Sequence, residues 1–135
     1  MAEETREFQV EIICPDRVFY TGKATMLELT TVDGEIGIYK GHIPVTTILA
    51  PGLVVITNGD QQTEAVVHSG FIEILQDKVS VLAEVAEWPE EIDLSRAEAA
   101  KERAEKRLNE RNENMDVARA ELALRRALVR IDAKR

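Results

Sequence analysis

Four arginines in the last third of the chain have the spacing of a phosphate-binding cluster. Arg126 and Arg130 are four residues apart, so on a helix they would share one face, about 6 Å apart along its axis. Arg96 and Arg103 would share a face of an earlier helix, about two turns apart. Because the guanidinium fork matches pairs of phosphate oxygens, this set of side chains favours a polyphosphate ligand.

The two pairs of arginines meet only if their helices fold back on each other. A turn centred between residues 111 and 112 would place Asp93, at the start of the first helix, opposite Arg130. The same register would bring Arg96 close to Arg126. The open end of the hairpin would then gather several guanidinium groups around the carboxylate of Asp93. Such a cluster repels itself unless an anion neutralises it.

A simpler role for these residues stays open. Asp93 could cap the first helix and pair with Arg96 at i,i+3, an interaction worth about 0.3 kcal/mol. Arg126 and Arg130 could instead bind acidic residues of a protein partner. No Walker-type lysine accompanies the arginines, so a bound nucleotide would be a regulatory ligand and not a substrate.

No other pattern indicates a catalytic site. Gly34, Gly37 and Gly41 do not form a G-x-x-x-x-G-K loop and are expected in turns and bulges. His42 has no nucleophile or carboxylate at a suitable spacing, and His68 lies in an H-S-G stretch that we assign to a turn. One cysteine and two histidines argue against a structural zinc site. We therefore expect a protein that is not an enzyme and has no metal centre.

Composition and charge describe a soluble protein in a reducing compartment. The 135 residues are 44% hydrophobic and 31% charged, and no apolar run approaches the roughly 20 residues of a membrane span. The acidic start M-A-E-E-T-R-E-F does not resemble a secretory signal, and Cys14 is the only cysteine. These features predict a cytoplasmic location.

The net charge of −8 is distributed unevenly. Residues 93–135 contain 12 Lys and Arg against 9 Asp and Glu, whereas residues 1–92 contain 5 against 16. This balance disfavours nucleic-acid binding, which needs a concentrated basic surface. The mildly basic tail could bind an acidic protein surface or a phosphate-bearing small molecule.

Residues 1–87 are predicted to form a β-sandwich of about ten short strands. The stretch F-Q-V-E-I-I-C places Phe8, Val10 and Ile12 on one face, and similar runs follow it. Turn signals separate the runs, among them Asn58–Gly59 and Ser69–Gly70. Short strands at this spacing are typical of a sandwich or a flattened barrel.

Residues 88–135 are predicted to form an antiparallel hairpin of two helices, over about 93–109 and 114–133. The N-E-R-N-E-N stretch between them is rich in turn formers. The seam of the hairpin is mostly alanine, so each contact removes little apolar area from water, at ~25 cal/mol per Å². The hairpin should therefore be marginal alone and able to rearrange against a partner.

Three segments resemble the epsilon subunit of the bacterial F-type ATP synthase. They are G-E-I-G-I-Y-K-G-H-I-P-V-T-T-I-L, S-G-F-I-E-I-L-Q-D-K-V-S-V-L-A-E and E-L-A-L-R-R-A-L-V-R-I. They occur in the family's order, and the resemblance covers nearly the whole chain.

The resemblance implies a non-catalytic, peripheral subunit at the cytoplasmic face of the plasma membrane. Its sandwich would sit at the foot of the central stalk, touching the gamma subunit and the ring of c subunits. Its hairpin would lie compact against the sandwich or extend toward the catalytic head of alpha and beta subunits. The extended hairpin would block ATP hydrolysis.

The family also implies a regulatory ATP site. Many members bind one ATP through an I/L-D-x-x-R-A motif, which here is residues 92–97. The resemblance assigns the adenine and ribose side to Glu87, Ile92 and Asp93, and the phosphates to Arg96, Arg103, Arg126 and Arg130. It implies no catalytic cofactor and leaves the magnesium requirement open. The main alternative is a purely structural epsilon subunit with a silent ATP motif; a free-standing nucleotide sensor is a further one.

Overall fold

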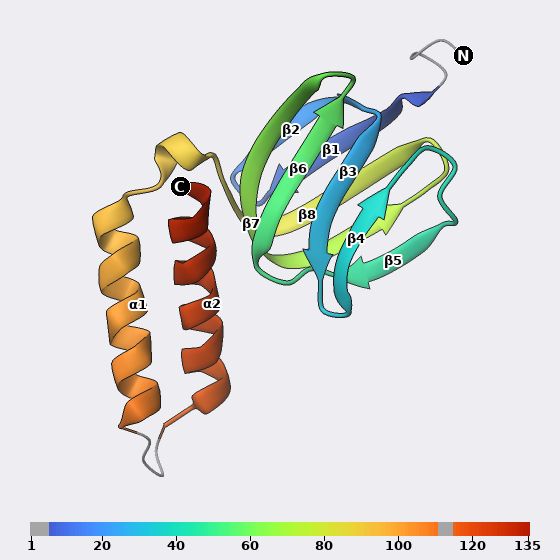
Figure 1. Cartoon of the computed structure of the whole chain (residues 1–135). Helices are drawn as coiled ribbons and strands as arrows, with labels where there is room; N and C mark the ends of the chain where they lie inside the picture. The colour runs from blue at the N-terminus through green and yellow to red at the C-terminus, as the bar shows by residue number, and fades with distance from the viewer. Residues whose placement is uncertain (1–5, 111–114) are drawn as a thin grey trace.

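The computed structural model describes residues 6–110 and 115–135 of the chain. Its N-terminal part is built of eight strands and its C-terminal part of two helices (Figure 1). This architecture confirms the predicted β-sandwich followed by a helical hairpin. The predicted hairpin turn between residues 111 and 112 lies outside the described residues.

The elements follow one another in a simple order. They are β1 (Phe8–Cys14), β2 (Arg17–Ala24), β3 (Met26–Thr31), β4 (Gly34–Ile38), β5 (Val45–Ile48), β6 (Gly52–Asn58), β7 (Gln61–Ile74), β8 (Lys78–Glu87), a 3-10 turn (Pro89–Glu91), α1 (Leu94–Asn109) and α2 (Val117–Ala133).

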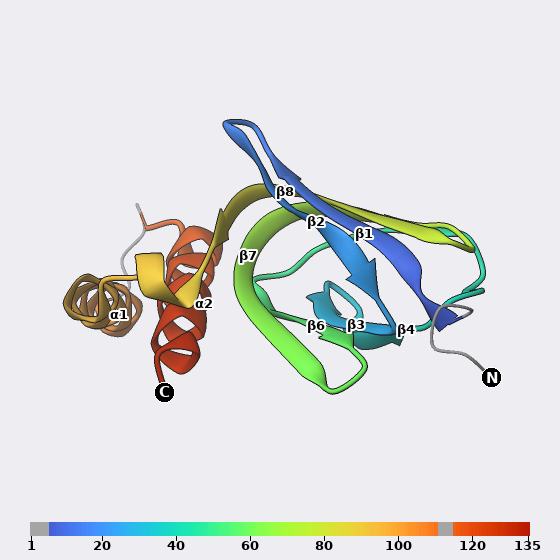
Figure 2. The same ribbon diagram turned by 90° about the horizontal axis from the view of Figure 1, so that it is seen from above.

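Strand β7 belongs to both layers of the sandwich. Its first half pairs with β6, and its second half pairs with β8 and β5. The remaining order is β2-β1-β8-β7-β6-β3-β4, with β1 and β8 parallel. Figure 2 shows β7 curving around one side of the sandwich to join the two layers.

The predicted turn at Ser69–Gly70 is wrong, because both residues lie inside β7. Ser69 has φ 54° and Gly70 has φ 125°, so the chain bends there without leaving the sheet. A side chain at Gly70 would clash with the carbonyl oxygen of Leu82 on β8. The two apolar runs on either side of this bend are therefore one 14-residue strand, and the sandwich has eight strands instead of about ten.

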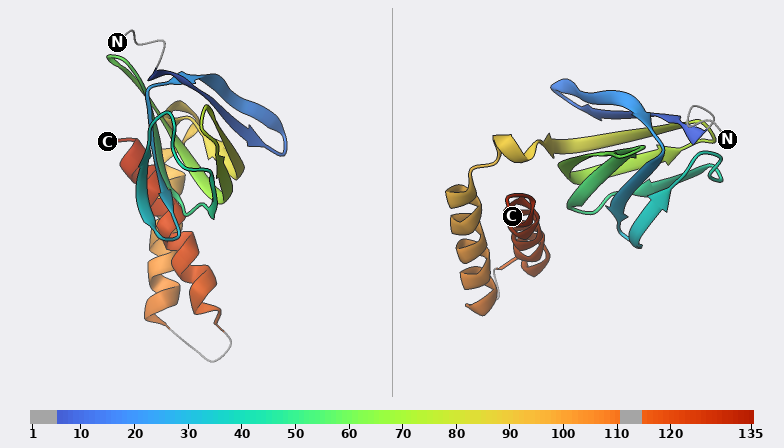
Figure 3. Two further views of the ribbon diagram at one scale, coloured as in Figure 1. Left: turned by 90° about the vertical axis from the view of Figure 1, so that its right-hand side faces the viewer. Right: turned by 45° about the horizontal axis from the view of Figure 1, so that its top comes forward.

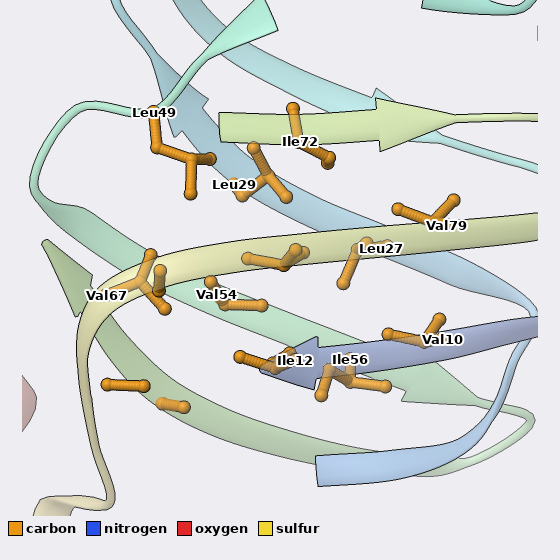
Figure 4. Packing of buried hydrophobic residues seen from close by; sticks show 14 of the residues in the cluster. Val10, Ile12, Leu27, Leu29, Leu49, Val54, Ile56, Val67, Ile72 and Val79 are labelled. Atoms are coloured by element: carbon orange, nitrogen blue, oxygen red, sulfur yellow. The ribbon is translucent and has the colours of Figure 1, made fainter. Parts of the chain in front are cut away.

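The core lies between the layers and is aliphatic. The predicted inward face of β1 is confirmed, since Phe8 is 3% exposed and Val10 and Ile12 are 0% exposed. Figure 4 shows Val10 and Ile12 among Leu27, Val54 and Val79 from other strands. This core makes the sandwich the rigid part of the chain.

The two helices begin at aspartates. The side chain of Asp93 accepts a hydrogen bond from the backbone N–H of Arg96 at 3.2 Å, and that of Asp116 from the N–H of Arg119 at 3.0 Å. Because Asp116 is the cap, α2 begins at Val117, later than the predicted residue 114.

Small side chains hold the helices together. The buried helical residues are Ala97, Ala104, Ala120 and Ala127. Helix α2 packs against β6 and β7, and it lies between α1 and the sandwich (Figures 2 and 3). The whole hairpin therefore rests on the sandwich mainly through α2.

Candidate functional site

A pocket of about 360 Å³ lies where the linker after β8 meets both helices. We call it the linker pocket. Its walls come from the end of β8, the linker, α1 and α2, and it is lined by Glu87, Glu91, Ile92, Asp93, Arg96, Ala97, Ala99, Ala100, Arg103 and Arg130. Chain segments from both domains are thus needed to form it.

Most of the residues predicted for an ATP site meet in this pocket. Those that line it are Glu87, Ile92, Asp93, Arg96, Arg103 and Arg130. Arg126 does not line it. Its Nη2 instead donates a hydrogen bond to Oγ of Ser69 at 3.1 Å, at the bend of β7. Arg126 and Arg130 share a face as predicted, but that face meets the sandwich, and only Arg130 also reaches the pocket.

Glu87 and Arg130 join the sandwich to α2. Nε of Arg130 donates to Oε1 of Glu87 at 2.7 Å, and their side chains are 30% and 23% exposed, respectively. Nε2 of the buried His68 lies 3.2 Å from the same oxygen. Because a carboxylate only accepts hydrogen bonds, this His68 nitrogen carries the proton. Bonds from His68 and Arg130 lower the pKa of Glu87 to about 2, against the opposing effect of burial.

The other charged groups of the pocket are less engaged. Asp93 is exposed and caps α1, which confirms the predicted cap but not the predicted ion pair with Arg96. Within residues 6–110 and 115–135, Asp93 forms no ion pair with an arginine, and the guanidinium groups of Arg96 and Arg103 have no polar partner. Two cations on α1 are therefore available to an anionic ligand.

Two of the polar groups at this site were not predicted as site residues. Glu91 lines the pocket, yet it belongs to no motif. His68 was expected in a turn, but it is a residue of β7 with 1% exposure, on the strand face opposite to Val67 of the core. E-A-V-V-H is one of the runs predicted to form strands, although His68 itself was assigned to the turn after it. The pairing of His68 with Glu87, 19 residues later, depends on the tertiary fold.

The arrangement can hold an anion. Its cations are Arg96, Arg103 and Arg130, and among the described residues no serine, cysteine or histidine lines it. In the part of the chain that the structure describes, no group of three His, Cys, Asp or Glu residues could hold a metal ion. In the same part, no helix is long and apolar enough to cross a membrane.

Two family profiles match the chain, one for each domain. The profile described as "ATP synthase, Delta/Epsilon chain, beta-sandwich domain" matches residues 7–89, and "ATP synthase, Delta/Epsilon chain, long alpha-helix domain" matches residues 90–135.

Curated relatives agree with these profiles. The ATP synthase epsilon chain of Brevibacillus brevis is 50% identical over 127 residues, which cover 93% of this chain and 96% of that one. The epsilon chain of Caldicellulosiruptor saccharolyticus is 45% identical over 105 residues, covering 78% and 77%.

Solved structures share the fold. A chain of the Euglena gracilis mitochondrial ATP synthase (OSCP/F1/c-ring) aligns with a TM-score of 0.80 at 22% identity, covering 90% of this chain and 78% of that one. A chain from the central stalk and c-ring of the Tetrahymena thermophila enzyme aligns with a TM-score of 0.62 at 10% identity, covering 95% and 96%.

Proposed function

This chain belongs to the ATP synthase delta/epsilon chain family, and we propose that it is an epsilon subunit that couples the rotor to the catalytic head and inhibits ATP hydrolysis through its hairpin. In this proposal ATP is a regulatory ligand that favours the compact hairpin. As a family member, the chain is a non-catalytic stalk subunit of the ATP synthase.

The composition of the linker pocket carries the ATP proposal. The guanidinium groups of Arg96 and Arg103, which have no polar partner among the described residues, come from α1, whereas Arg130 comes from α2. Glu87, Ile92 and Asp93 line the same pocket, and the resemblance to the family assigns them to adenine and ribose. A triphosphate between the arginines would relieve the repulsion among them.

Bound ATP would act on the position of the hairpin by linkage. The pocket needs Glu87 from the sandwich together with residues of both helices, so it is complete only while the hairpin is compact. A ligand that binds only this form favours it by about 2.7 kcal/mol at a hundredfold excess over its Kd. Low ATP would then release the hairpin, and the extended hairpin would inhibit hydrolysis.

The contacts that hold the hairpin suit a movable element. In the described part of the chain, two polar contacts, Arg130–Glu87 and Arg126–Ser69, join α2 to the sandwich. The fully buried residues of α1 and α2 are alanines, so the larger apolar side chains that α2 exposes to water when it leaves are ones already in partial contact with water. Extended, the basic hairpin would meet acidic surfaces of the beta and alpha subunits.

The sandwich is proposed to bind the gamma subunit and the c-ring at the cytoplasmic face of the plasma membrane. Large apolar side chains are exposed around β5 and the preceding loop: Tyr39 is 60% exposed, Ile43 76% and Ile48 59%. This part of the sandwich faces away from the helices (Figure 1), so docking there leaves the hairpin free to move. An exposed apolar patch is typical of an interface.

One observation favours the alternative of a structural epsilon subunit with a silent motif. Arg126 and Arg130 already have partners within the chain, Ser69 and Glu87. If the role of these arginines is only to make these two contacts, the compact hairpin is stable without a bound nucleotide.

Calorimetric titration of the isolated chain with ATP, with and without Mg²⁺, separates the two functions. The test variant is Arg103→Ala, which removes a pocket cation. The matched control is Arg107→Ala, one turn later on the same helix and outside the pocket. Saturable binding that is lost only in Arg103→Ala supports the ATP sensor. Absence of binding at millimolar ATP supports the silent motif.

A further inference from the structure

The linker between β8 and α1 is packed onto strand β2. The ring of Trp88 stacks on Phe19, with centroids 4.2 Å apart and an angle of 21° between the planes. Tyr20 meets Trp88 edge-on at 6.3 Å. Phe19 is 7% exposed and part of the core, so the tryptophan extends the sandwich core into the linker.

An arginine of β2 holds the other end of the same turn. Nη2 of Arg17 donates to both carboxylate oxygens of Glu91, at 2.9 and 3.0 Å, and its guanidinium lies 5.0 Å from the Phe19 ring centre. Oε1 of Glu91 also accepts the backbone N–H of Trp88 at 3.0 Å. We call Arg17, Phe19, Trp88 and Glu91 the linker clamp.

The charge state of Glu91 suits this role. The N–H of Trp88 and, after it, Arg17 lower the pKa of the Glu91 carboxyl. The carboxylate is therefore charged at neutral pH, when Arg17 is also charged.

The linker clamp ends where the linker pocket begins. Glu91 and Ile92 line the pocket, and Ile92 is only 5% exposed, with its N–H bonded to the carbonyl of Pro89. Asp93, the next residue, is the cap of α1. All four clamp residues belong to β2 and the linker, and none belongs to the hairpin. Movement of α1 and α2 therefore breaks no contact within the clamp.

We propose that the linker clamp positions the Ile92–Asp93 wall of the nucleotide pocket and fixes the pivot of the hairpin at these two residues. This proposal rests on the proposed ATP binding and hairpin movement. Arg17 and Trp88 are positioning residues, because they act on the pocket through Glu91 and Ile92 and do not line it. The Ile92–Asp93 wall stays in place on the sandwich when the hairpin moves. The wall formed by α1 and α2 is present only when the hairpin is compact.

A preformed wall raises the affinity for the ligand. Without the clamp, binding would also have to order the linker turn and its side chains. The need to order the side chains of one short turn weakens binding about tenfold. Removal of Arg17 should therefore raise the Kd for ATP about tenfold without removing any group that lines the pocket.

The test compares the full chain with Arg17→Ala, Arg17→Lys and Lys23→Ala. Lys23 is the matched control, an exposed cation on the same strand outside the clamp. The first measurement, without nucleotide, is acrylamide quenching of Trp88, the only tryptophan. Arg17→Ala should make Trp88 more accessible, Arg17→Lys should restore part of the protection, and Lys23→Ala should match the wild type.

The second measurement is the Kd for ATP, by calorimetry, in the same four proteins. We expect about a tenfold rise in Arg17→Ala, a smaller rise in Arg17→Lys and none in Lys23→Ala. In the wild type, quenching of Trp88 should be the same with and without saturating ATP, because the pivot lies beyond Glu91.

Two results overturn the inference while leaving the proposed function intact. One is ATP binding by the wild type with the same Kd in Arg17→Ala and Lys23→Ala. The other is stronger quenching of wild-type Trp88 when ATP is removed, which would place the pivot before residue 88. If the wild type binds no ATP, the proposed function fails first. Unchanged quenching in Arg17→Ala would then refute the clamp separately.

Discussion

Acid should weaken the contact between Glu87 and Arg130. The pKa of Glu87 is about 2 in the folded protein, below its ordinary value of 4.5, because His68 and Arg130 stabilise the carboxylate. A lowered folded-state pKa contributes stability that is present above about pH 4.5 and is lost as the pH falls toward 2. The whole shift corresponds to about 3 kcal/mol. Because Glu87 is 23% exposed, we expect solvent screening to leave about 1–2 kcal/mol.

The assay is urea unfolding of the wild type and Glu87→Gln, followed by circular dichroism at several pH values between 3 and 7. At pH 7 the variant should be less stable by about 1–2 kcal/mol. At pH 3 less than half of that difference should remain, because the wild-type carboxylate takes up a proton on unfolding. The free energy of unfolding should fall with urea concentration at a similar slope in the two proteins.

The matched control is Glu90→Gln, an exposed carboxylate three residues after Glu87, in the linker, without a polar partner in the described part of the chain. It should unfold like the wild type at every pH. A difference between Glu87→Gln and the wild type that does not change from pH 7 to pH 3, or that equals the difference for Glu90→Gln, would refute the reasoning.

Two further predictions concern packing. Gly70→Ala should destabilise the sandwich by about 2 kcal/mol or more in urea unfolding, because the new side chain meets the β8 backbone. The control Gly41→Ala, at φ 84° with open space around it, should lower the stability by only about 1 kcal/mol. Ala127→Leu overfills a position that is 1% exposed and should destabilise the hairpin by about 1–3 kcal/mol, measured by thermal unfolding, whereas Ala118→Leu on the exposed face should not. Equal effects within either pair would contradict the packing described.

Periodicity in the sequence was enough to predict the two kinds of domain. The alternation in β1 predicted which of its residues face the core, and the alanine seam predicted a hairpin with a small buried area. Periodicity failed at Ser69–Gly70, because residues with positive φ occur both in turns and in bends within a strand. The register of β7 with β8 decides between the two, and it is a tertiary property.

For the candidate site, the sequence predicted most of the residues but few of the contacts that they make. Spacing along a helix placed Arg126 and Arg130 on one face, but it could not say how far each side chain reaches. Partners from distant strands were not predictable in the same way. His68 approaches Glu87 from another strand, and Arg17 approaches Glu91 from 74 residues away.

The parallel pairing of β1 with β8 also governs the order in which the chain acquires its structure during synthesis. Residues 9–13 find their partners only at residues 78–82. The β1–β2 ribbon leaves the ribosome with one edge unsatisfied, and the sandwich closes after almost the whole domain has been translated. The helices emerge next, onto a surface that has just been completed. Any delay in translating β8 therefore prolongs the exposure of that edge.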